Sequence, residues 1–182
     1  MYNKTVLILL LLVVPIGFAQ RTTASNIQAG DFAIYLLKDD TLKTWEVILR
    51  SLDSLTIADH PLIRIDDVVS YDWPNHSIML TPKGIQKVRS AVTKRTSTLP
   101  FPFVVVVGNE KVYLGNMYLM PSSYMAGDIP HIDVSQFTEL QTALGSRPTG
   151  VKINRAPDVT VPDIRNHIRV YQALLKKNKV KS

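Results

Sequence analysis

The fold is decided by the stretch from Phe101 to Met120, which reads FPFVVVVGNEKVYLGNMYLM. Residues 101–107 are a short apolar run rich in β-branched and aromatic side chains, which is typical of a buried strand. Gly108-Asn109-Glu110 has the composition of a tight turn, and residues 111–120 supply the returning strand, which Pro121 ends. The stretch therefore predicts a β-hairpin.

A second hairpin and a helix precede it. Residues 68–73 predict a strand, Pro74-Asn75 a turn, and residues 77–80 the returning strand. Thr81-Pro82 then combines an N-cap residue with the proline that favours the first helical position. The helix carries one apolar stripe, formed by Ile85, Val88 and Val92, with lysines on another face. It is expected to pack on a sheet.

The segment before these hairpins is less regular. Residues 31–37 are aromatic and β-branched and predict a first strand. Residues 41–52 place Trp45, Ile48, Leu49 and Leu52 at helical spacing, yet the same residues could equally be extended. Residues 31–143 are therefore predicted to form an α+β domain, with a small antiparallel or mixed sheet of two hairpins and one or two packed helices.

The C-terminal part is expected to be an appendage. Residues 144–157 are rich in Gly, Pro and Arg and predict a linker-like loop. Residues 158–182 predict a basic amphipathic helix, capped by Thr160. Its apolar stripe comprises Ile164, Ile168, Tyr171 and Leu175. Such a stripe usually docks on the parent domain; left undocked, it would bind a membrane surface or a partner protein.

The first nineteen residues have the pattern of a secretory signal peptide. Lys4 supplies a positive start, residues 6–14 are an unbroken apolar run, and small residues precede an expected cleavage site between Ala19 and Gln20. The alternative, an uncleaved anchor, would need about 20 apolar residues, and Pro15 interrupts this run. A secreted or periplasmic protein is expected, with residues 20–30 as a flexible leader.

The net charge of +6 is concentrated in the tail. Residues 20–150 carry 12 basic and 13 acidic side chains, whereas residues 151–182 carry eight basic and two acidic ones. Because the main domain is neutral and the predicted compartment is extracytoplasmic, nucleic acid is not an expected partner. The tail suits anionic lipid or polysaccharide, or it is simply a solvated helix end. The chain has no cysteine, which excludes disulfides, thiol nucleophiles and thiolate metal sites.

No motif points to catalysis. The chain has neither a G-x-S-x-G elbow nor a glycine-rich phosphate loop. The close pairs Asp72 with His76 and His131 with Asp133 lack a third metal ligand in the sequence pattern. No cofactor or metal is predicted, and an enzyme is not expected.

The candidate binding residues form two groups. Tyr71 and Trp73 are two residues apart on a predicted strand, so they face the same side, and His76 follows closely. These rings either line the core or offer a stacking surface for a peptide or a sugar. The second group is the lysine cluster at the end of the chain, formed by Lys176, Lys177, Lys179 and Lys181.

Residues 60–115 resemble a known family. The order of motifs is His60-Pro61-Leu62-Ile63, then Asp66-Asp67-Val68-Val69-Ser70, then residues 77–88 (SIMLTPKGIQKV), then residues 103–113 (FVVVVGNEKVY). This order resembles the periplasmic head subdomain of SecD-type protein-export accessory proteins. The resemblance implies a small α+β platform that contacts polypeptide and has no active site. The chain departs from that family in its hairpin turn, which lacks the usual Asp-Gly, and in having no transmembrane helices.

Three functions follow as hypotheses. The first is a secreted or periplasmic non-enzymatic binding module, whose exposed strand or aromatic face meets extended polypeptide in the envelope. The second is an envelope-surface protein that acts through its basic C-terminal helix. The third is a small hydrolase whose His and carboxylate side chains converge only in the fold.

Overall fold

The computed structural model describes residues 30–95, 100–119, 128–156, 160 and 162–181. The predicted signal peptide and almost all of the leader lie outside these residues and stay predictions. The strands are β1 (Phe32–Leu36), β2 (Ile63–Arg64), β3 (Val68–Asp72), β4 (Ser77–Leu80), β5 (Phe101–Val107), β6 (Glu110–Tyr118), β7 (His131–Asp133), β8 (Gly150–Asn154) and β9 (Val180–Lys181). The helices are α1 (Thr44–Val47), α2 (Pro82–Arg95), α3 (Glu139–Ala143) and α4 (Ile168–Lys176), with 3-10 turns η1 (Leu52–Ser54), η2 (Ile65–Asp67), η4 (Ser135–Phe137) and η5 (Ile164–Asn166).

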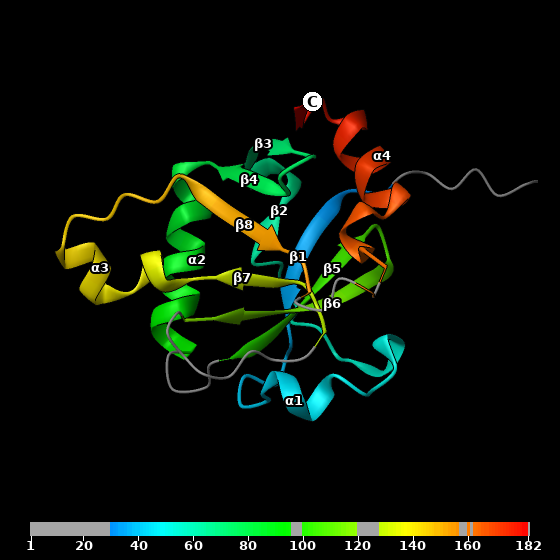
Figure 1. Ribbon diagram of the computed structural model, residues 1–182, viewed down its shortest axis with the longest axis horizontal. Helices are drawn as coiled ribbons and strands as arrows, with labels where there is room; N and C mark the ends of the chain where they lie inside the picture. Colours follow the sequence, from blue (N-terminus) through cyan, green and yellow to red (C-terminus); the bar gives the residue numbers. More distant parts are fainter. Residues whose placement is uncertain (1–29, 96–99, 120–127, 157–159, 161, 182) are drawn as a thin grey trace, which may run out of the picture.

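The predicted fold class, a small sheet of two hairpins, is wrong. The nine described strands form one mixed, curled sheet in the order β2-β1-β5-β6-β7-β8-β4-β3-β9 (Figure 1). Both predicted hairpins exist, as β3–β4 and β5–β6, but β7 and β8 lie between them. The prediction failed because these linking strands come from segments with weak or loop-like sequence patterns.

The β5–β6 hairpin has the predicted position and turn. Its antiparallel register runs from Phe101 opposite Met117 to Val107 opposite Glu110. Gly108 adopts φ +62°, a left-handed conformation that glycine tolerates without strain. Every residue of β5 is buried. The hairpin therefore forms the centre of the fold.

The core lies on two sides of this sheet. On the inner side, Phe101 and Phe103 join a main core that α2 and α4 cover. On the outer side, Val104 and Val106 meet a smaller core formed with Leu37, Val47 and Leu55. Side chains alternate across a strand, so a strand covered on both faces needs apolar residues at every position. The continuous apolar run of β5 is explained by this double coverage.

Helix α2 follows the prediction closely. The Thr81 hydroxyl accepts a hydrogen bond from the Gly84 N–H at 3.2 Å, which caps the helix. Val88 and Val92 are fully buried, and Ile85 packs against the same core. The helix is therefore the amphipathic cover that its apolar stripe predicted.

The C-terminal region differs from its prediction in two ways. Residues 144–157 are not wholly a linker-like loop, because Gly150–Asn154 is strand β8. The helix begins at Ile168, after the 3-10 turn η5, and not near Thr160. Two apolar positions, Val151 and Ile153, are too weak a pattern to outweigh a Gly- and Pro-rich setting.

The face that α4 buries is also not the predicted stripe. Val170, Ala173 and Leu174 are buried, whereas Ile168 is 60% and Leu175 51% exposed. The predicted stripe assumed one continuous helix, whereas Ile164 lies in η5, outside α4. Within α4 the neighbouring stripe of Val170, Ala173 and Leu174 faces the core, a choice that depends on where the helix docks. The helix is nevertheless docked, in contact with β1, β5 and β9.

Candidate functional site

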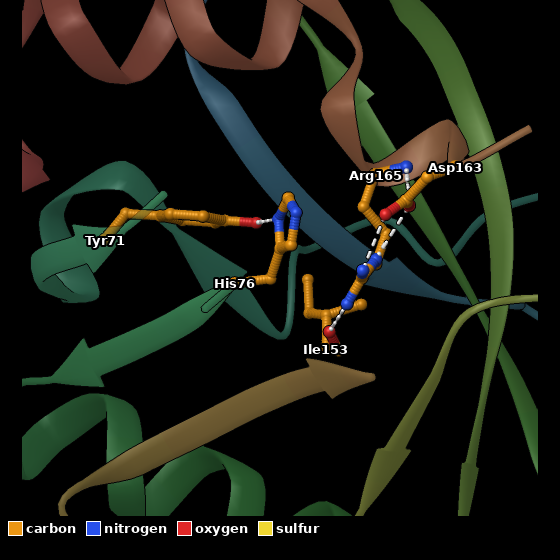
Figure 2. Close-up of polar contacts among 5 residues, drawn as sticks. All are labelled: Tyr71, His76, Ile153, Asp163 and Arg165. Atoms are coloured by element: carbon orange, nitrogen blue, oxygen red, sulfur yellow. Dashed lines mark hydrogen bonds and ion pairs between the residues drawn. The ribbon is translucent and has the colours of Figure 1, made fainter. Parts of the chain in front are cut away.

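The predicted aromatic patch does come together, but in the interior. Tyr71 is fully buried and His76 is 3% exposed. The Tyr71 hydroxyl and the His76 Nδ1 share a hydrogen bond of 3.0 Å (Figure 2). Trp73 lies partly buried between this pair and α4, with its ring 5.0 Å from that of Tyr171. The patch joins α4 to β3 and leaves no stacking surface at Tyr71 or His76.

A second polar pair, Asp163 and Arg165, connects this region to β8. Arg165 donates to both carboxylate oxygens of Asp163, at 2.8 and 2.6 Å, and its Nη1 donates to the Ile153 carbonyl at 2.7 Å (Figure 2). The Ile153 N–H in turn donates to the His76 carbonyl at 3.0 Å. The turn at residue 76, strand β8 and the segment before α4 are thereby connected.

The electrostatics of this cluster favour neutral rings. Burial lowers the pKa of His76, and the Arg165 charge lowers it further. Burial raises the pKa values of Tyr71 and of the neighbouring Tyr113. A neutral imidazole could act as a base, but the bases of catalysis must reach a substrate. Because Tyr71 and His76 are buried, the cluster has a structural role.

The four predicted lysines lie on different elements. Lys176 and Lys177 are exposed near the end of α4, and Lys177 pairs with Asp31 at 3.1 Å. Lys179 lies between α4 and β9, where its carbonyl accepts the Tyr71 N–H at 2.6 Å. Lys181 belongs to β9. Tertiary structure therefore divides the cluster between a helix end and a sheet edge.

Sequence reasoning missed a solvent-exposed part of the sheet, the outer face of β8-β4-β3-β9. Cross-strand pairing places Lys152, Ser77, Asp72 and Lys181 in one row across these four strands. Gly150, Met79 and Ser70 form the next row. Together with Gln136 and Thr149, these rows line a shallow hollow of about 380 Å³. We call this surface the open face.

The available signal for the open face was in β8, where the apolar Val151 and Ile153 alternate with the polar Lys152 and Asn154. Such alternation indicates a strand with one solvated side. In β4, Met79 is 44% exposed while Ile78 and Leu80 are buried, but all three residues are apolar and gave no such signal. In the first row of the open face, hydrogen bonds from the side chain and backbone of Asn75 lower the pKa of Asp72, and the Lys152 charge lowers it less. This row presents two cations, Lys152 and Lys181, beside the Asp72 carboxylate.

The close pairs Asp72 with His76 and His131 with Asp133 were not predicted to bind a metal, and their side chains have other contacts. Within the described residues, no group of three or more His, Cys, Asp or Glu side chains could hold a metal ion. Asp133 is engaged by Ser135, whose N–H and hydroxyl both reach its Oδ1. His131 packs its ring against Tyr118. Among the described residues, no helix combines the length and the apolarity needed to cross a membrane.

Comparisons with known proteins add no relative. No model of a protein family matches the chain, and searches of curated proteins and of solved structures found no significant match. The resemblance of residues 60–115 to the SecD head subdomain therefore stays a prediction that no comparison tests.

Proposed function

We propose that the protein is a non-enzymatic binding module, secreted or periplasmic, that holds an extended segment of another polypeptide on its open face. The observation that carries the proposal is the unequal coverage of the sheet. The outer side of β5 lies under the layer of α1 and η1, whereas the outer sides of β4 and β8 are lined by Met79 and Lys152, which are exposed. One face of an antiparallel sheet is commonly solvated, and here Met79 and Lys152 offer a partner both apolar and charged contacts on that face.

The neighbouring sheet edge supports an extended partner. Strand β9 has two residues and pairs only with Tyr71 and Asp72, so no described strand lies beside Val68–Ser70 of β3. An added strand gains main-chain hydrogen bonds at such an edge, while its side chains reach the adjacent face. Val69 at this edge is 46% exposed. A polypeptide strand could therefore continue the sheet where β9 leaves β3 uncovered.

The charges of the open face indicate the class of peptide. Lys152 and Lys181 are the cations of its first row, and Asp72 between them also interacts with Asn75. An extended segment with acidic and apolar side chains on one side would complement these lysines and Met79.

The other two hypotheses have less support. A surface anchor through α4 could use only the exposed Ile168 and Leu175, because Val170, Ala173 and Leu174 are buried against the core. A hydrolase would need an accessible base beside carboxylates; His76 is buried, and Asp133, next to the half-buried His131, is bonded to Ser135.

Binding of labelled acidic and basic peptides with alternating apolar residues tests the proposal. We expect the acidic peptides to bind. The Lys152→Glu substitution should lower their affinity about tenfold, equivalent to roughly 1.4 kcal/mol of binding free energy. Lys83→Glu on α2 makes the same charge change away from the open face and should leave peptide binding unchanged. Equal losses in the two variants would mean that only net charge matters and would contradict the proposal.

A further inference from the structure

A second candidate site lies between α2 and the segment that leads into β2. This groove has a volume of about 500 Å³, in the range of roughly 300–1,000 Å³ that is usual for small-molecule sites. Its apolar lining comes from Leu36, Ala58, Pro61 and Leu62. Leu36 and Leu62 each keep 8% of their surface exposed there, and Ala58 and Pro61 are half-buried. We call this site the α2 groove.

The charge of the α2 groove is one-sided. Among the residues that the structure describes, Lys83, Lys87 and Arg95 line it as cations and no acidic side chain does. The hollow at the β5–β6 turn, by contrast, includes Asp53 and Glu110. The open face includes Asp72. An anion would therefore meet no carboxylate in the lining of the α2 groove.

The three cations are not equally available. Lys87 pairs with the buried Asp67 at 2.6 Å. Arg95 donates to the Leu37 carbonyl at 3.2 Å and lies over the Phe101 ring. Lys83 is exposed and forms no ion pair with any residue that the structure describes. It also lies in the first turn of the 14-residue helix α2, where the helix dipole favours negative charge.

The groove runs along α2 from Lys83 to Arg95. Lys83 and Arg95 are twelve residues apart on α2, which corresponds to about 18 Å along the helix axis. We infer that the α2 groove binds a long-chain carboxylate, with its carboxylate at Lys83 and its alkyl chain along Leu36, Pro61 and Leu62. The methylene groups of the lysines add apolar surface along the rim.

Titration with decanoate below its micelle concentration tests this inference, with amide chemical shifts in α2 and residues 58–62 as the readout. We expect decanoate to bind, and acetate and decyl maltoside to bind at least about tenfold more weakly, because each lacks one half of the recognised chemistry. Binding of acetate as strong as that of decanoate, or no shift with decanoate, would overturn the inference.

Two variants separate the α2 groove from general effects. Lys83→Glu should weaken decanoate binding about tenfold, and Ser90→Trp should fill the groove from the exposed side of α2 and abolish binding. Lys152→Glu on the open face is the charge-matched control and should bind decanoate normally. If Ser90→Trp fails to fold, the decanoate affinities of Lys83→Glu and Lys152→Glu are compared instead, and equal affinities would overturn the inference.

The same two charge reversals keep the proposals distinct. Loss of peptide binding in Lys152→Glu tests the open face, whereas loss of decanoate binding in Lys83→Glu tests the α2 groove. Either proposal can therefore fail while the other stands.

Discussion

Strands β5 and β4 share one inner core but differ on their outer sides. The outer-facing Val104 and Val106 of β5 are buried beneath the segment that carries α1 and η1. The outer-facing Ser77 and Met79 of β4 line the open face. A continuous apolar run thus corresponds to a strand with two covered faces in β5. In β4 one face is uncovered although Ile78, Met79 and Leu80 are all apolar. The uncovered half of the sheet is the part that is free to meet a partner.

The largest expected effect comes from placing a carboxylate on each outer side. Val104→Asp would bury an unpaired charge and should destabilise the protein by more than about 4 kcal/mol, or prevent folding. Met79→Asp should change stability by no more than about 0.5 kcal/mol, because its side chain already reaches solvent. Urea unfolding measures both. Similar losses in the two variants would mean that the two halves are equally covered.

The next comparison concerns the inner core, which α4 helps to cover. Leu174→Ala should lower the free energy of unfolding by about 2 to 5 kcal/mol, because this side chain is fully buried. The adjacent Leu175→Ala should stay within about 0.5 kcal/mol, because Leu175 is 51% exposed. A larger loss of stability in Leu175→Ala than in Leu174→Ala would support the helix face predicted from the sequence.

The two tryptophans offer a smaller contrast. Trp73→Ala removes the ring that packs against Tyr171 and should destabilise the protein by about 2 kcal/mol, less than a fully buried tryptophan. Trp45→Ala, on the outer layer, removes a ring that is 47% exposed and lies near the Lys43 ammonium. Trp45→Ala should lower the free energy of unfolding by no more than about 1 kcal/mol. An unchanged stability in Trp73→Ala would mean that the Trp73 ring does not contribute to the packing of α4 on β3.

The smallest effect is a dependence of stability on pH. Burial holds the pKa of His76 below its ordinary value of 6.5, so the unfolded chain takes up this proton more readily than the folded one. The contribution of His76 is therefore present above pH 6.5 and is lost as the pH falls below it. Urea midpoints between pH 8 and pH 5 should fall less steeply in His76→Asn than in the wild type.

The choice of variant and of control affects the interpretation of the pH experiment on His76. Asparagine suits position 76 because His76 has φ 50°, a left-handed conformation that asparagine tolerates. Burial also lowers the pKa of His131, so some pH dependence should remain in the variant. His60→Asn, at an exposed position, is the control. An unchanged slope in His76→Asn would remove His76 as a source of the effect.

Local chemistry made several elements predictable. The hairpin of β5 and β6 follows from an apolar run, a turn and a returning strand within twenty residues. The capped start of α2 at Thr81 and its buried stripe were equally readable, because hydrogen bonds and side-chain spacing within one helix determine them. The aromatic patch could be predicted only as a cluster, since a strand pattern does not say which side is covered.

What the sequence by itself determined is therefore the set of segments that fold through their own neighbours: two hairpins and the helix α2. Only the tertiary structure decided that Gly150–Asn154 and Val180–Lys181 are strands, that α4 buries Leu174 and not Leu175, and that the open face exists. The physical reason is that a short strand obtains its hydrogen bonds from distant segments. β8 pairs with β4 and β7, and β9 pairs with β3, more than 100 residues earlier in the chain.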